Sequence, residues 1–226
     1  MLEGMSNRSA DMIVYPKLRG VLHLATFPIS IAVSAALIAL SPTSPMRGAV
    51  IVYAVTTMLL FGNSALLHMS HGRWGRRVNH VILVIDYSNI FLTIAGTNTP
   101  FIMALEPRIR WPYLAAIWAA ATVGIVCHLI WPHGHDQIFT AVYIVLGLAP
   151  VSLLPMLWAS PFIGPTVTLI IAAGGVAEVA GAICFALRKP NPLPAWFGYH
   201  ELFHLGTVIG YACHATALFL TLSAMR

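Results

Sequence analysis

Seven long apolar segments follow one another along this chain with almost no polar sequence between them, and they constrain the fold more than any other feature. Each is about twenty residues or longer, the length at which an α-helix crosses the hydrocarbon core of a bilayer. Hydrophobic residues make up 58% of the 226 residues and charged residues only 8%, a composition outside the range of soluble domains. The sequence therefore predicts an all-α integral membrane protein, a bundle of seven transmembrane helices. We expect the spans near residues 19–41, 48–71, 81–104, 112–132, 137–157, 162–187 and 197–224.

The positions of the twelve basic residues predict the orientation of the bundle. Eight fall in the N-terminal segment and in the loops on the same side of the spans: Arg8, Lys17, Arg19, Arg73, Arg76, Arg77, Arg188 and Lys189. The other four lie on the opposite side: Arg47, Arg108, Arg110 and Arg226. The positive-inside rule then places the N-terminus inside and, with an odd number of spans, the C-terminus outside. We expect a cytoplasmic segment over residues 1–18 and one membrane domain over residues 19–226, located in the inner (plasma) membrane.

The net charge of +5 is small and is explained by this topology and by contact with anionic lipid. We therefore expect no nucleic-acid partner. Cys127, Cys184 and Cys213 all fall within predicted spans and lack the spacing of a thiolate metal site, so they are interpreted as packing residues.

The start of the seventh predicted span carries two histidines and a glutamate in the segment HELFH. His200 and His204 are four residues apart, so on a helix they lie on one face, close enough to share a metal ion. The same letters fit the HExxH pattern of zinc proteases, in which Glu201 would be the general base. In the alternative interpretation the histidines only cap or pack the helix start. Within hydrocarbon, polar side chains are costly, which favours a functional role.

Polar residues of two other spans are predicted to reach the same depth in the membrane. The second span ends on this side with Ser64 and His68, one helical turn apart, and Asp86 follows about a turn into the third span. Three neutral imidazoles, from His68, His200 and His204, would leave a tetrahedral zinc ion with an open position for water, as in catalytic sites. Asp86 could deprotonate that water or orient a ligating histidine. Ser64 could donate a hydrogen bond to the site or bond back to its own helix.

Four separated motifs, in this order, resemble the hemolysin III family, the bacterial branch of the progestin and adipoQ receptor (PAQR) family. They are the serine and histidine at 64 and 68, IDYSNIFLTIAGTNTPF at 85–101, the GG pair at 174–175 and PNPLPAWFGYHELFH at 190–204. The resemblance begins at about Tyr15 and covers almost the whole chain. It implies seven helices, an inside N-terminus and one zinc ion near the cytoplasmic face.

The family's functional residues match individual positions of this sequence. Its serine and first histidine match Ser64 and His68, its aspartate matches Asp86, and its last histidine pair matches His200 and His204. In relatives the residue after the first histidine of that pair need not be acidic. The resemblance therefore implies that Glu201 is not the essential base.

Glu178, His214 and His23 are further titratable residues within the predicted spans. Glu178 stands where the family usually has an aromatic residue, and its carboxyl is either functional or protonated and hydrogen-bonded to a neighbouring helix. His214 lies ten residues beyond His204, about 15 Å along a helix axis, too far to share its metal ion. His23 has a suitable depth to approach the site, although one histidine on one helix is a weak signal.

Two classes of function remain open at this stage. The first is a zinc-dependent hydrolase of a lipid amide or ester, with Asp86 as the base and Ser64 or a second water assisting. The second is a non-catalytic sensor or receptor-like protein in which zinc ties the second and seventh spans together. A pore-forming cytolysin, which the family name suggests, is disfavoured because few charges within the spans could line an aqueous pore. A membrane lipid is the expected substrate or ligand, and the oligomeric state stays open.

Overall fold

The computed structural model describes residues 16–70, 73–131 and 136–226. The predicted cytoplasmic segment 1–18 lies almost wholly outside these residues. Seven stretches of the described chain are long and apolar enough to cross a membrane, which confirms the prediction of an all-α, multi-pass membrane protein. The helices are α1 (Val21–Leu40), α2 (Ser44–Met69), α3 (Arg76–Met103), α4 (Pro107–Ile130), α5 (Asp136–Leu148), the 3-10 helix η1 (Ala149–Leu153), α6 (Leu154–Ala159), α7 (Gly164–Leu187) and α8 (Tyr199–Ala224).

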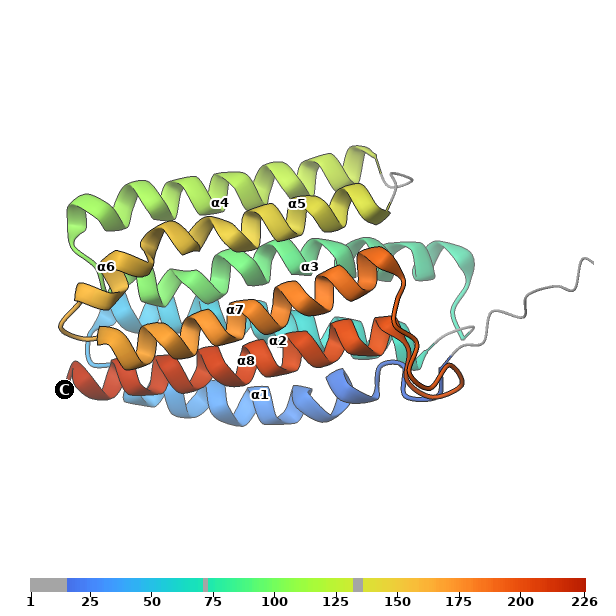
Figure 1. The fold of residues 1–226 in the computed structure, drawn as a ribbon, viewed down its shortest axis with the longest axis horizontal. Coiled ribbons are helices and arrows are strands. Elements are labelled where there is room, and N and C mark those ends of the chain that lie inside the picture. Colours follow the sequence, from blue (N-terminus) through green and yellow to red (C-terminus); the bar gives the residue numbers. More distant parts are fainter. Residues whose placement is uncertain (1–15, 71–72, 132–135) are drawn as a thin grey trace, which may run out of the picture.

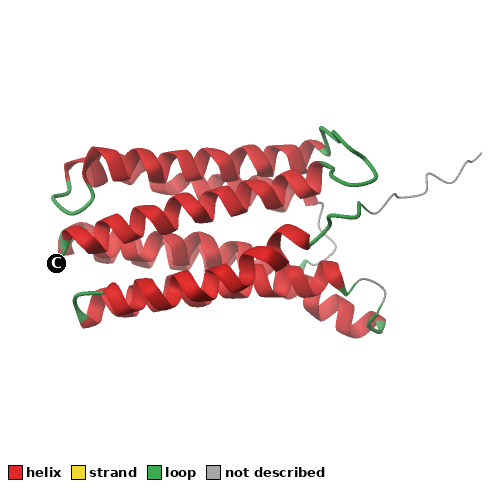
Figure 2. Ribbon diagram, turned by 90° about the horizontal axis from the view of Figure 1, so that it is seen from below, coloured by secondary structure: helices red, strands yellow, loops and turns green. Residues whose placement is uncertain are grey.

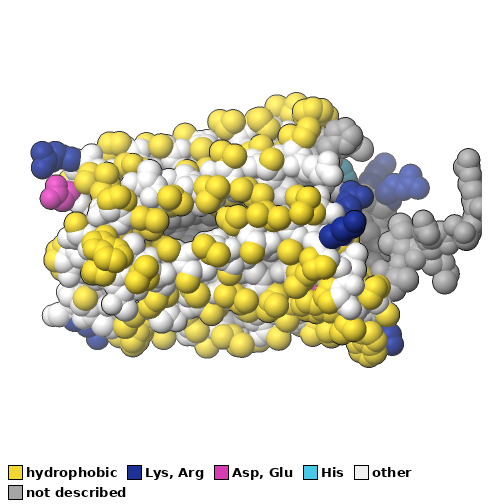
Figure 3. Space-filling model, in the orientation of Figure 1, with side chains coloured by type: hydrophobic (Ala, Val, Ile, Leu, Met, Phe, Trp, Pro, Cys, Tyr) yellow, Lys and Arg dark blue, Asp and Glu magenta, His cyan; other side chains and the backbone are white. Residues whose placement is uncertain are grey.

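The helices run side by side along one common axis (Figures 1 and 2). Helix α8 packs between α1 and α7, and α2 packs between α1 and α3. Helices α4 and α5 extend the bundle from α3 and α7 (Figure 1). On the face drawn in Figure 3, hydrophobic side chains cover the length of the bundle and the charged side chains lie at its two ends, as expected for a surface in contact with lipid.

Three helices begin four or five residues before the predicted spans. Helix α2 starts at Ser44, where the Thr43 side chain accepts a hydrogen bond from Met46 N, and α4 starts directly at Pro107. Helix α3 starts at Arg76, so Asp86 lies ten residues into it, nearly three turns and not about one turn as predicted. Hydropathy detects only the apolar part of a span and misses polar first turns. Asp86 is therefore deeper in its helix than the sequence indicated.

The fifth span is one crossing built from three pieces, α5, η1 and α6. The prediction of a single segment over 137–157 is correct for its position but not for its continuity. Pro150 lies in η1 and Pro155 lies in the first turn of α6, and each removes a backbone donor that a continuous α-helix would use. The chain passes this point as a 3-10 turn.

The loop before α8 is tied to the segment that leads into α1. The backbone N–H groups of Lys17 and Leu18 donate to the carbonyls of Ala195 and Trp196 at 3.1 and 3.2 Å, and the Lys17 ammonium lies 4.3 Å from the centre of the Trp196 ring. Gly20 ends this lead-in with a φ of 81°, a left-handed conformation that disfavours side chains. These contacts bring the start of α8 beside the start of α1 and the end of α2.

Candidate metal centre

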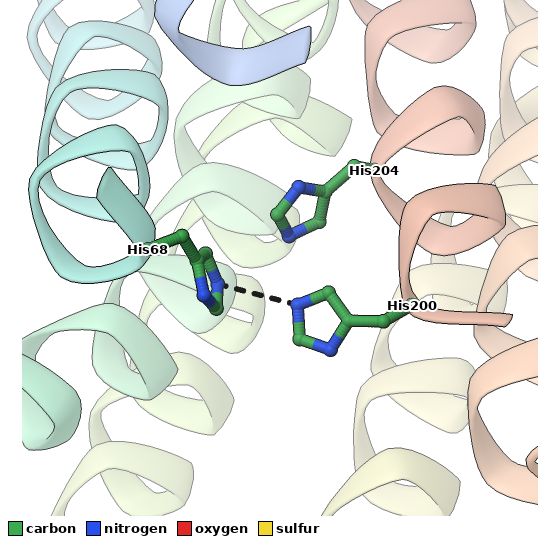
Figure 4. A group of neighbouring side chains, drawn as sticks. All are labelled: His68, His200 and His204. Atoms are coloured by element: carbon green, nitrogen blue, oxygen red, sulfur yellow. Dashed lines mark hydrogen bonds between the residues drawn. The ribbon is translucent and has the colours of Figure 1, made fainter. Parts of the chain in front are cut away.

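The three predicted metal ligands come together at one end of the bundle. His68 lies in the last turn of α2, and His200 and His204 lie in the first two turns of α8. One nitrogen from each ring lies within 4.8 Å of the other two, and Nε2 of His200 is 3.2 Å from Nε2 of His68. The three rings converge on a common point (Figure 4). The structure thus assembles these three imidazoles from residues far apart in sequence.

The donor set fits a zinc ion. Imidazole nitrogens bind zinc at about 2.0–2.1 Å, so two of them on a tetrahedral ion are roughly 3.3 Å apart. The separation of 3.2 Å between His68 and His200 matches this spacing, and a modest side-chain rotation would bring His204 to it. Imidazole also suits copper, nickel and iron, so the ligands alone do not select the metal.

His23 is a fourth histidine at the cluster. It is 1% exposed, and its ring stacks on His204 with centroids 3.8 Å apart and planes 10° apart. Its Nε2 lies 2.9 Å from the hydroxyl of Thr207, which itself donates to the His204 carbonyl at 2.8 Å. Because the hydroxyl has only one proton, Nε2 of His23 must be the donor to Thr207. We interpret His23 and Thr207 as a support that fixes the position of the His204 ring.

Asp86 and Ser64 lie beside one another in the same region. The Asp86 carboxylate accepts a hydrogen bond from the Asn63 amide at 3.4 Å and also contacts the Ser64 hydroxyl. The Asn63 amide donates in addition to the Ile82 carbonyl at 3.1 Å, which fixes its orientation between α2 and α3. Asn63 and Ser64 both belong to α2. Within the described chain, the Asp86 carboxylate is therefore held by side chains of α2 and not by the imidazole of a predicted metal ligand. The catalytic roles of Asp86 and Ser64 stay predictions.

One partly open cavity of about 80 Å³ connects these groups. All five residues predicted for the site line it, together with His23 and Thr207. The rest of its wall is mainly apolar and comes from five helices, including Leu60, Ile90, Tyr143, Phe185 and Phe203. The arrangement places three potential metal ligands, a carboxylate and a hydroxyl next to a surface suited to hydrocarbon.

Glu201 has a different role from the one that the HExxH pattern suggests. Its side chain is buried, its Oε1 accepts from Nε of Arg19 at 2.5 Å, and its Oε2 accepts from the backbone N–H of Gly198 at 2.7 Å. The second contact is a cap for the first turn of α8. Both oxygens of the carboxylate are thus engaged in holding the helix start, and Glu201 does not line the cavity of the histidine cluster.

Glu178 and His214 form a separate pair between α7 and α8. Oε1 of Glu178 lies 3.6 Å from Nδ1 of His214, and the Glu178 side chain is 40% exposed at the surface of the bundle while His214 is buried. A side chain at Gly210 would collide with the Glu178 carboxyl, so this glycine makes the approach possible. His214 is not part of the three-histidine cluster, in agreement with its predicted distance.

Sequence reasoning missed three contributors to the site: Asn63, Thr207 and Arg19. Asn63 and Thr207 stand one and three residues from predicted site residues, but short polar side chains in a span usually bond to their own helix. Arg19 contributed only to the charge count. The pairing of Arg19 with Glu201 joins residues 182 positions apart, a contact that no local pattern indicates.

Comparison with known proteins agrees with this architecture. A family model described as "Haemolysin-III related" matches residues 12–215. "Hemolysin-3" of Bacillus cereus is 33% identical over 156 residues, which cover 69% of this chain and 68% of the relative. "Hemolysin-3 homolog" of Bacillus subtilis (strain 168) is 29% identical over 140 residues, which cover 61% of this chain and 63% of the relative.

Proposed function

The chain belongs to the hemolysin III family, and from this membership and its histidine cluster we propose that it is a zinc-dependent membrane hydrolase that cleaves an amide or ester bond of a lipid. The observation that carries the proposal is the shared cavity, in which three imidazoles, the carboxylate of Asp86 and the hydroxyl of Ser64 meet an apolar wall. A closed structural zinc site would need four protein ligands, whereas three leave a position for a reactant.

Each residue has a definite task in this reaction. His68, His200 and His204 would hold the zinc ion, which when bound would polarise a carbonyl and make water nucleophilic at neutral pH. Asp86, oriented by the Asn63 amide, accepts the proton of the attacking water and returns it to the leaving group. Ser64 donates its single hydroxyl proton to the Asp86 carboxylate, and once Asp86 has taken a proton the hydroxyl can donate to the oxyanion instead.

The apolar wall accounts for a lipid substrate. Phe185 and Phe203 pack on one another with centroids 5.3 Å apart, and Phe185 also packs edge-on against His200 at 5.4 Å. An acyl chain lying along these rings would bring its carbonyl to the histidine cluster. The charge distribution supports placing this end of the bundle at the cytoplasmic face of the inner membrane.

A second candidate is a sensor or receptor-like protein with a structural zinc ion. One observation favours it: the ligands bridge α2 and α8, and His23 adds α1 through its stack on His204. Binding of zinc would then fix the relative positions of three helices at one end of the bundle.

Fatty-acid release from a panel of lipid amides and esters separates the two candidates. Zinc-loaded wild type should release fatty acid, and Asp86→Asn should release at least about a hundredfold less while keeping its zinc, because it lacks the general base. Glu201→Gln, checked for zinc content, should keep most of the activity. No turnover by the zinc-loaded wild type would reject the hydrolase, and selective loss in Glu201→Gln would replace Asp86 by Glu201 as the base.

A further inference from the structure

A second, larger cavity opens beside the histidine cluster at the same end of the bundle. Its volume is about 390 Å³, within the range of small-molecule sites. His68, Leu67 and Leu83 line both this cavity and the one that contains the histidine cluster. The two cavities are therefore adjacent and share these three residues in their walls.

The polar lining of the larger cavity contains two arginines. Arg19, Arg76, Asn79 and His80 contribute to it, and no acidic side chain does so among the described residues. Glu201 holds the guanidinium of Arg19 through its Nε atom, which fixes the side chain at the cavity wall. Arg76 forms no ion pair with a carboxylate in the described part of the chain. Arg76, Asn79 and His80 also belong to the first turns of α3, whose N-terminus favours an anion.

Asn79 also lines the cavity, but its Oδ1 atom is buried and has no hydrogen-bond partner within the described chain. What the cavity offers a ligand is therefore its arginine side chains, which suit an anionic group.

We propose that this cavity binds the phosphate of an anionic lipid headgroup, so that the lipid substrate of the neighbouring site is a phospholipid of net negative charge. Arginine side chains suit phosphate because they donate several hydrogen bonds in a fixed plane. With the phosphate between Arg19 and Arg76, the apolar part of the lipid passes Leu67 and Leu83 and reaches the cavity of the histidine cluster. The substrate class rests on the proposed function, whereas the binding of the phosphate does not.

Lipid binding to the full-length protein in zwitterionic nanodiscs tests this site. The probe is short-chain phosphatidylglycerol, whose retention on the protein is counted by native mass spectrometry. Arg76→Gln should raise the Kd at least about tenfold, since it removes hydrogen bonds to a charged group. Arg77→Gln is the matched control, because it removes the same charge one residue away and does not line the cavity. Its Kd should stay within about twofold of wild type, as expected for screened surface charge.

Two results of this binding experiment would contradict the proposal. Equal weakening by Arg76→Gln and Arg77→Gln would overturn the site in favour of diffuse attraction between the basic end and anionic lipid. Displacement of the probe by millimolar inorganic phosphate, with no preference for the lipid, would overturn the lipid headgroup as the source of the phosphate. Chelated protein should bind the probe with unchanged Kd. If the protein releases no fatty acid, the measured binding of phosphatidylglycerol still stands. If it does not bind phosphatidylglycerol, the proposed hydrolase activity is still tested separately by fatty-acid release.

Discussion

Removing the charge of Arg19 should destabilise the protein strongly. The partner carboxylate of Glu201 has a side-chain exposure of 1%, so Arg19→Gln would leave a buried charge without its counter-ion. Breaking a buried ion pair in this way costs about 3–5 kcal/mol. For a chain of this length the midpoint of thermal unfolding should fall by about 6–20 °C, measured in detergent by the loss of monodisperse protein.

Substitution of the partner residue, Glu201, should lower the stability less. In Glu201→Gln the new amide oxygen can still accept from the Gly198 N–H and cap α8, and Arg19, with 15% side-chain exposure, retains access to water. We expect Glu201→Gln to lower the free energy of unfolding by about 1–3 kcal/mol. The double variant Arg19→Gln/Glu201→Gln should be more stable than Arg19→Gln alone, because it leaves no carboxylate buried without a partner. If Glu201→Gln cost as much as Arg19→Gln, or if the two effects added, the ion pair would not be what holds the start of α8.

Three further predictions concern the lead-in to α1, the support of His204 and the membrane topology. Gly20→Ala should lower the free energy of unfolding by about 1–2 kcal/mol, because alanine is strained in the left-handed backbone conformation of this position. Its Cβ would also lie 2.7 Å from Cβ of His68, so the affinity for zinc should fall, and unchanged metal retention on dialysis would refute this effect. Thr207→Val should weaken zinc binding about 10–100-fold, because it removes the hydrogen bond that holds His23. Competition with a chelator measures the affinity, and an unchanged value would mean that His23 does not position His204. A reporter fused after Arg226 should be read on the outside and one inserted between Arg73 and Arg77 in the cytoplasm; the reverse would move the histidine cluster to the other face.

The sequence predicted the spans and the convergence of the histidines well, because both follow from simple periodicities. Hydropathy located seven crossings, and the spacing of His200 and His204 placed both rings on one face of α8. Alternation of direction from span to span then brought His68 to the same end of the bundle. None of these steps needs knowledge of side-chain packing.

The contacts that hold the site could not be predicted in this way. His23 reaches His204 because α1 packs directly on α8, and neighbour relations among seven helices are not encoded in hydropathy. The roles of Glu201 and Asp86 were also open, since a carboxylate near two histidines fits a base, a cap or an ion pair equally well. The structure shows that Glu201 pairs with Arg19 and caps α8 through the N–H of Gly198.

The zinc content of purified protein tests the central claim most directly. Wild type, measured by inductively coupled plasma mass spectrometry, should carry about one zinc ion per chain, and the double variant His200→Ala/His204→Ala should carry almost none. His128→Gln is the matched control, because His128 is buried between Tyr87 and Phe139, outside the cluster, and it should keep the full zinc content. Full occupancy in the double variant would contradict the assignment of the metal to these histidines.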